Sequence, residues 1–100
     1  MTLNKIFSDI GWEGYQYWIQ EDKKILKKIN ALIQDIERNG NEGLGKPEAL
    51  KKNLSGYWSR RITDVHRIVY RTDDNNLFIA KCRGHYNRPL LKSHLHVFAR

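Results

Sequence analysis

After an opening stretch of seven residues, the apolar residues of this chain change their spacing once, close to Gly56. Before that point they recur every three or four residues, which is the period of an amphipathic helix. After it they alternate with polar residues, which is the period of a half-buried strand. Helices followed by a run of strands are typical of an α+β fold. A chain of 100 residues allows one such domain with one modest core.

Two helices are predicted in the first forty residues. A short strand over residues 3–7 comes first, and Ser8 then supplies the N-cap of the first helix. The second helix covers residues 23–39, and Gly40 ends it. We expect an aromatic stripe of the first helix to face inward; its members are Trp12, Tyr15, Trp18 and Ile19. The apolar face of the second helix consists of Ile25, Leu26, Ile29, Leu32, Ile33 and Ile36.

The rest of the chain predicts a loop, a short helical turn and three strands. Residues 41–46 form the loop, and Pro47 at a helix-start position favours one turn through Lys52. The strands follow as a meander joined by short turns, which makes them antiparallel. They cover residues 57–62, 66–71 and 77–83. We therefore predict an α+β fold in which two N-terminal helices pack on one face of an antiparallel sheet of four to five strands, while the other face meets solvent or ligand.

The positive charge lies in the second part of the chain. Residues 1–45 hold six Lys and Arg against seven Asp and Glu, whereas residues 46–100 hold twelve against four. A basic half favours a polyanionic partner, most simply nucleic acid, over a merely solvated basic surface. Cys82 is the only cysteine, which fits a reducing compartment. No signal peptide or membrane span is evident, so we expect a cytoplasmic protein without a membrane partner.

Three residues far apart in the sequence offer the chemistry of RNA cleavage. The Glu48 carboxylate can take a proton from a ribose 2′-OH, His85 can give one to the leaving 5′-oxygen, and Arg67 can hold the phosphate. Tyr86 could orient His85, stack on a base or donate the proton itself. Each residue alone has a simpler explanation, because an exposed Glu is usually a counter-ion and a lone exposed His is usually incidental.

Further basic and aromatic side chains surround this set. A turn centred on Asp64 would put Arg61 directly opposite Arg67, and a phosphodiester bound between them would resolve the repulsion. Lys51 and Lys52 extend the basic stretch beside Glu48. Tyr57 shares the strand face of Arg61 and could stack on a base, whereas we assign Trp58 to the core.

Neither a metal nor a cofactor is predicted. A two-metal nuclease needs several converging carboxylates, and the only adjacent pair, Asp73-Asp74, is explained by turn formation. His94 and His96 lack further ligands at metal-binding spacing. Alternation within the last strand gives Cys82 a packing role and not that of a nucleophile.

Four stretches of the sequence are distinctive. They are Gly45-Lys46-Pro47-Glu48, Asn53-Leu54-Ser55-Gly56-Tyr57-Trp58-Ser59-Arg60-Arg61-Ile62-Thr63, His66-Arg67-Ile68-Val69-Tyr70 and Cys82-Arg83-Gly84-His85-Tyr86. Through them the chain resembles the YoeB toxins of the RelE superfamily over residues 3–86. The resemblance implies a RelE-like microbial RNase fold for a toxin domain of residues 1–86. Family chains usually end at the His–Tyr pair, so residues 87–100 are a C-terminal extension.

The resemblance also implies an activity and a role for each site residue. Toxins of this family cleave mRNA in the ribosomal A site without a metal, and they leave a 2′,3′-cyclic phosphate and a 5′-OH. Carried over, Glu48 is the general base, His85 the general acid, and Arg67 the residue that stabilises the transition-state phosphate. Tyr86 helps to place the acid. Phosphate binding falls to Lys51 and Arg61.

The implied partners are a YefM-like antitoxin, the A site of the 70S ribosome with its mRNA, and a second copy of the chain. Operator DNA is implied only for the toxin–antitoxin complex. Two alternatives stay open: a basic ribosome or RNA binder that inhibits translation by occupancy, and an antitoxin-dependent transcriptional co-repressor. Both explain the charge equally well, but neither explains why acid, base and anion-holding residues occur together.

Overall fold

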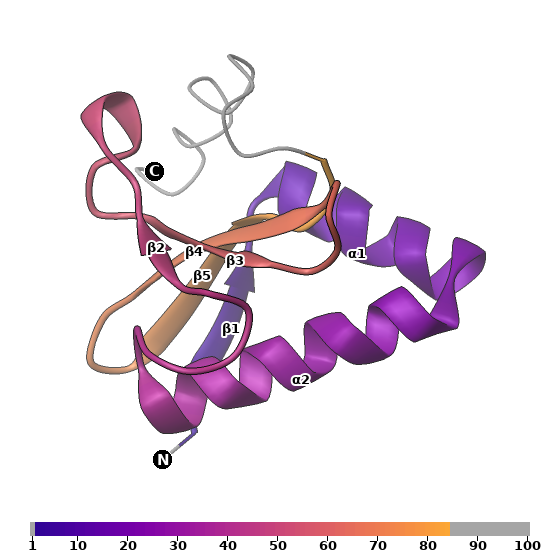
Figure 1. Cartoon of the computed structure of the whole chain (residues 1–100). Coiled ribbons are helices and arrows are strands. Elements are labelled where there is room, and N and C mark those ends of the chain that lie inside the picture. Colours follow the sequence, from indigo (N-terminus) through magenta and orange to yellow (C-terminus); the bar gives the residue numbers. More distant parts are fainter. Residues whose placement is uncertain (1, 85–100) are drawn as a thin grey trace.

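A computed structural model describes residues 2–84 of the chain (Figure 1). In chain order its elements are β1 (Asn4–Phe7), α1 (Asp9–Glu21), α2 (Lys23–Asn39), β2 (Glu48–Ala49), the 3₁₀ turn η1 (Lys52–Leu54), β3 (Trp58–Arg61), β4 (Arg67–Thr72) and β5 (Asn76–Lys81). Among these described residues, neither helix is long and apolar enough to cross a membrane.

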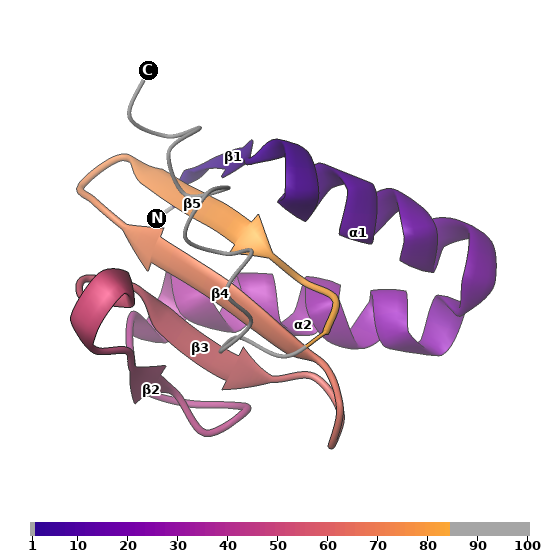
Figure 2. The ribbon, with the colours of Figure 1, turned by 90° about the horizontal axis from the view of Figure 1, so that it is seen from above.

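The five strands form one sheet in the order β1-β5-β4-β3-β2 (Figure 2). The predicted α+β architecture and the antiparallel meander are confirmed, but β1 runs parallel to β5 and makes the sheet mixed. The reason is topological. β1 joins the far edge of the meander beside its last strand, so no hairpin connects the two and nothing requires them to be antiparallel.

Helix α1 packs on the sheet through its glycines. Ser8 caps the helix as predicted: its hydroxyl accepts from the Gly11 N–H at 3.0 Å and donates to the Ala80 carbonyl at 2.7 Å. The buried residues of α1 are Gly11, Gly14 and Trp18, whereas Trp12 is 47% exposed and Ile19 is 38% exposed. The predicted inward stripe is therefore wrong at Trp12 and Ile19, because the close approach of helix and sheet turns the glycine face inward.

Helix α2 supplies the larger part of the core. Its predicted bounds are confirmed, and the Gly40 N–H closes the helix on the Ile36 carbonyl. The apolar face of α2 and the buried side chains of the sheet form one cluster with Trp18. Its fully buried members from α2, β4 and β5 include Ile29, Leu32, Ile36, Ile68, Tyr70, Leu77 and Ile79. Each such aliphatic side chain contributes roughly 1.5–3 kcal/mol through burial.

The opposite face of the sheet is partly covered by the connection between β2 and β3. Leu50, Val69 and Ala80 form a small buried cluster there, with Leu54 and Tyr57 packed against it. The helical turn predicted through Lys52 is wrong, because Glu48–Ala49 is a strand and the turn comes later, at η1. Two backbone hydrogen bonds on either side of the β2–β3 pairing hold this edge strand: Arg61 N–H to the Gly45 carbonyl at 2.7 Å and Leu50 N–H to the Tyr57 carbonyl at 2.9 Å.

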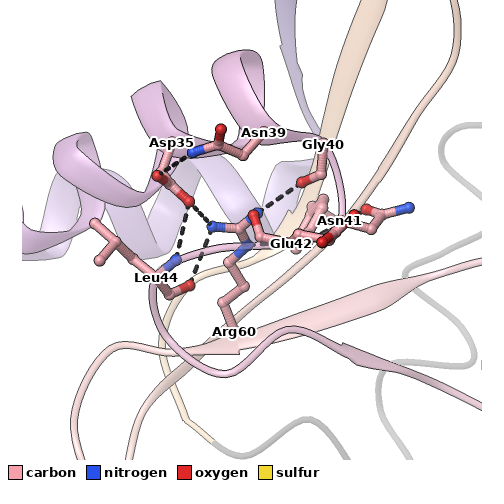
Figure 3. A network of polar contacts seen from close by, with 8 residues as sticks. Asp35, Asn39, Gly40, Asn41, Glu42, Leu44 and Arg60 are labelled. Carbon is pink, nitrogen blue, oxygen red and sulfur yellow. Dashed lines mark hydrogen bonds and ion pairs between the residues drawn. The ribbon is translucent and has the colours of Figure 1, made fainter.

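A buried arginine fixes the loop that leads into β2 (Figure 3). The Arg60 side chain is fully buried and its guanidinium lies 2.5 Å from the Asp35 carboxylate. Its Nε donates to the Tyr70 hydroxyl at 3.1 Å. The other N–H groups reach three carbonyls of the loop after α2, those of Gly40, Glu42 and Leu44. Because this loop precedes Glu48 by a few residues, the network also fixes where β2 begins.

Candidate functional site

Arg61 and Arg67 are direct cross-strand partners on β3 and β4. The predicted register is therefore confirmed. Arg60 points toward Asp35 on α2, so its neighbour Arg61 faces the other side of the sheet. Ile68 lies in the helix-side core, so Arg67 also faces away from the helices. Two guanidinium groups thus share the helix-free face, and both side chains are half-buried.

Strand β2 adds Glu48 to the same face. Glu48 pairs with Ser59, which lies two residues before Arg61 on β3. Cross-strand partners project to the same side of a sheet, and diagonal neighbours lie about 7–8 Å apart. Glu48 is exposed, and its carboxylate forms no ion pair with any other residue in the range 2–84. The fold therefore brings Glu48, Arg61 and Arg67 together from three strands.

Arg61 carries an unsatisfied hydrogen-bond donor. Its Nε is buried and has no hydrogen-bond partner in the described part of the chain. Buried polar atoms are almost always paired in folded proteins, so such an atom calls for an explanation. An anion held between Arg61 and Arg67 would provide the acceptor, and a phosphate matches the fork of a guanidinium.

The other predicted RNA-binding residues lie toward the opposite end of β3. Leu50 pairs with Tyr57, and Lys51 and Lys52 follow in the exposed connection beyond that point. Tyr57 does face the predicted side, but it packs on the cluster of Leu50. The fold therefore does not gather these residues around the arginine pair: Tyr57 shares the face of the pair, whereas Lys51 and Lys52 lie in the exposed connection between β2 and β3.

Arg71 belongs to this face and was not predicted. Its guanidinium stacks 3.9 Å from the centre of the Phe78 ring, and its Nε donates to the Tyr57 hydroxyl at 3.4 Å. The sequence did hold a signal for it, because Arg67, Val69 and Arg71 alternate along β4 and must share one face. Arg71 thus prolongs the basic surface from the arginine pair toward Tyr57.

His66 is a second residue that sequence reasoning missed. Its Nδ1 accepts the Gly84 N–H at 2.8 Å, and its ring lies edge-on against Trp18 with the centroids 4.8 Å apart. Burial lowers the pKa of His66, and the cations of Arg83 and Lys81 lower it further. At neutral pH the imidazole is therefore uncharged and can accept this hydrogen bond. No residue pattern in the sequence indicated the contact.

Several predicted residues lie outside the described part of the chain. These are His85, Tyr86, His94 and His96. Within residues 2–84 no cluster of three or more His, Cys, Asp or Glu side chains could hold a metal ion. The packing role of Cys82 is confirmed: its side chain is fully buried, and burial raises the pKa of its thiol to about 12.

Comparison with known proteins identifies the family. Residues 7–86 match the YoeB-like toxins of bacterial type II toxin–antitoxin systems. The toxin YoeB of Escherichia coli K12 is 58% identical over 84 residues, which is 84% of this chain and all of that protein. The chain belongs to the YoeB toxin family. The resemblance to YoeB toxins is thereby confirmed.

Solved YoeB structures agree with this fold. The YoeB dimer from Staphylococcus aureus superposes with a TM-score of 0.81 at 55% identity and covers 86% of this chain and all of that one. The heterotetrameric YoeB-YefM complex of the same organism gives 0.80 at 55% identity, with the same coverage. YafQ from E. coli shares the fold alone, with 15% identity and a TM-score of 0.68 over 84% of this chain and 94% of YafQ.

Proposed function

We propose that this YoeB-family chain is a metal-independent endoribonuclease that cuts mRNA in the ribosomal A site and so stops translation. One observation carries the proposal: Glu48, Arg61 and Arg67 come from three strands onto one face of the sheet, with the two arginines directly opposed. A carboxylate beside paired guanidinium groups suits a phosphodiester whose negative charge grows during reaction.

The proposed reaction is an internal transfer at phosphorus. Glu48 takes the proton of the ribose 2′-OH, the 2′-oxygen forms a bond to phosphorus, and the bond from phosphorus to the 5′-oxygen breaks. His85 protonates that 5′-oxygen, and Tyr86 helps to place His85. Arg67 and Arg61 hold the non-bridging oxygens. The products are a 2′,3′-cyclic phosphate and a 5′-OH, with no water consumed in the step.

The exposure of Glu48 supports a dependence on the ribosome. An exposed carboxylate on a two-residue edge strand does not by itself align a 2′-OH with the neighbouring phosphorus. Alignment of the reacting atoms is worth several kcal/mol in reactions of this kind. A ribosome that presents the mRNA in a fixed conformation would supply it, and Lys51, Lys52 and Tyr57 would contact the flanking RNA.

The family relationship supports a set of protein partners. Staphylococcal YoeB has been solved as a dimer and together with YefM. We propose that this chain likewise forms a homodimer, that a YefM-like antitoxin neutralises it, and that operator DNA is bound only by the complex. The toxin domain comprises residues 1–86 in this proposal, and residues 87–100 are a C-terminal extension.

Primer extension on translating ribosomes tests the activity. The parent chain should produce cuts inside A-site codons, and Glu48→Gln should reduce the cleavage rate about 10²- to 10⁴-fold, the usual contribution of a general base. Glu13→Gln is the matched control, since Glu13 is also exposed but lies on α1. Full cleavage by Glu48→Gln, Arg67→Gln and His85→Gln would rule out the proposed mechanism.

The same experiment separates cleavage from occupancy. Translation inhibition that persists in His85→Gln, with the mRNA intact, would favour a basic ribosome binder. Loss of inhibition together with loss of cleavage supports the ribonuclease. Operator binding with antitoxin but no growth arrest on expression would instead favour the co-repressor.

A further inference from the structure

His66 joins three parts of the fold that are distant in sequence. Its backbone carbonyl accepts the N–H groups of Ile62 and Thr63, which closes the turn between β3 and β4. Its ring packs edge-on against Trp18 of α1 at an interplanar angle of 78°. Its Nδ1 accepts the N–H of Gly84, the last residue that the structure describes. The side chain is therefore placed to hold the chain where it leaves the sheet.

The residues around Gly84 are held one by one. The Trp18 indole N–H donates to the Cys82 carbonyl at 2.9 Å, and the Arg83 guanidinium lies 3.5 Å from the centre of the Tyr17 ring. Gly84 itself is held at both polar groups, because its carbonyl accepts the Arg67 N–H at 3.1 Å. Two hydrogen bonds thus tie Gly84 to the consecutive residues His66 and Arg67.

We propose that His66 is a positioning residue of the ribonuclease site: by holding Gly84 it sets the point from which the chain continues to His85, relative to Arg67. The inference rests on the proposed function, since it gives His85 the role of acid. Arg67 holds the phosphate in that proposal, and its backbone N–H donates to the Gly84 carbonyl. His66 acts through Gly84 and makes no contact with RNA in this scheme.

The acceptor role of His66 requires an unprotonated Nδ1. The charged groups that face the imidazole are Arg83, next to Gly84, and Lys81 of β5, while α1 presents the uncharged Trp18. Both neighbours are cations and both oppose protonation of the ring. Once protonated, Nδ1 becomes a donor and can no longer accept from the Gly84 N–H.

Two substitutions of His66 separate the hydrogen bond from the packing. His66→Phe keeps a ring against Trp18 but removes the acceptor. His66→Asn loses the ring but places an amide oxygen close to the position of Nδ1. We expect His66→Phe to lower kcat on ribosomes about 10- to 100-fold, as loss of an orienting partner commonly does. KM should stay unchanged, and His66→Asn should restore most of kcat.

The Gly84 amide reports on its hydrogen bond to His66 independently of activity. In the full-length ¹⁵N-labelled chain its hydrogen exchange should be slow and its chemical shift should follow the titration of His66. The protection factor of this amide, which compares its exchange rate with that of an unstructured amide at the same pH, should fall in His66→Phe and in the parent at low pH. It should stay high in His66→Asn. A Gly84 amide that is indifferent to His66 protonation in the parent overturns the proposal, even if a variant fails to fold.

The two readouts also distinguish this inference from the proposed function. Fast Gly84 exchange in a folded His66→Phe variant that cleaves as well as the parent overturns the positioning role and leaves the ribonuclease intact. Equal loss of kcat in folded His66→Asn and His66→Phe overturns it as well. A parent chain that does not cleave ribosome-bound mRNA contradicts the proposed function. The exchange rate and chemical shift of the Gly84 amide would still show whether its hydrogen bond to His66 exists.

Discussion

Arg61 and Arg67 face each other as the last cross-strand pair before the turn between β3 and β4. Like charges directly opposite on an antiparallel ladder destabilise the pair. Stability alone therefore gives no reason for this arrangement. The backbone nevertheless enforces it, because Arg60 on the same strand is fixed by Asp35 and Ile68 on the neighbouring strand is fully buried. The arrangement therefore supports the proposed binding of a phosphate between the two guanidinium groups.

Arg61→Gln should separate binding from stability. The substitution removes one of two opposed charges, so we expect unchanged or slightly higher thermal stability at low salt, and a smaller gain in stability on adding salt than the parent shows. Cleavage should fall about 10- to 100-fold, as loss of a charge-assisted hydrogen bond to phosphate predicts. Thermal unfolding at two salt concentrations and primer extension measure both effects. A clear loss of stability at low salt would contradict this interpretation.

Sequence reasoning succeeded where local rules decide the structure. The apolar period and the cap at Gly40 predicted α2, and the short turn at Asp64 predicted the Arg61–Arg67 register. It failed at β2, a two-residue edge strand that exists only through its pairing with Ser59 and Trp58 of β3. No local preference encodes that pairing, and Pro47 pointed to a helical turn instead.

The same distinction applies to the site. Glu48 and Arg67 were proposed from their chemistry, but only the register could show that both lie on one face of the sheet. Arg71 followed from alternation along β4 and was overlooked. The contact between His66 and Gly84 depends on how α1, the turn and the end of β5 meet, which is a tertiary property that a single sequence does not reveal.

Gly11→Ala should destabilise the fold, although replacing a glycine by alanine inside a helix ordinarily stabilises a protein. A Cβ at Gly11 would come within 2.4 Å of the Ile79 carbonyl oxygen, so α1 must move away from β5. Overpacking of this kind typically costs about 1–3 kcal/mol. Chemical denaturation measures it. Gly40→Ala is the comparison. An alanine there is strained by the positive φ of the backbone, but no atom lies within 4 Å of the new Cβ, so no overpacking is added. Equal stability of Gly11→Ala and the parent would contradict the close packing.

Arg60→Leu should destabilise the fold far more than substitution of an exposed arginine. It leaves the Asp35 carboxylate and three loop carbonyls without the guanidinium that pairs with them. Removing one partner of a buried ion pair costs about 3–5 kcal/mol, and because the Asp35 side chain is 13% exposed we expect a loss at the lower end of that range. The free energy of unfolding in urea checks this value, with Arg38→Leu on the surface of α2 as a control. A loss below about 1 kcal/mol would mean that the network adds little.

The Cys82 thiol should be unreactive in the folded protein. It is fully buried, and its pKa of about 12 leaves almost no thiolate at neutral pH. A thiol-specific reagent should therefore modify Cys82 only after addition of denaturant, at a rate that follows unfolding. Because Cys82 is the only cysteine, each modified thiol corresponds to one protein molecule. Rapid modification under native conditions would show that α1 separates readily from the end of β5.

Asp35 should make the protein sensitive to strong acid. The pKa of Asp35 lies below its ordinary value of 3.8. The main cause is the hydrogen bond that its carboxylate accepts from the Arg60 guanidinium, and the hydrogen bond from the Leu44 N–H adds to it. The unfolded chain therefore binds this proton more readily than the folded one. The stabilisation is fully present above pH 3.8 and is lost as the pH falls from there through the lower pKa of the folded state. Unfolding free energies between neutral and acidic pH should show a steeper decline for the parent than for Asp35→Asn.

Asp64→Asn is the control, since Asp64 is exposed and forms no ion pair in the described part of the chain. This variant should keep the parent's steep decline. Parallel pH profiles for the parent and Asp35→Asn would show that the Arg60 network does not depend on the charge of this carboxylate.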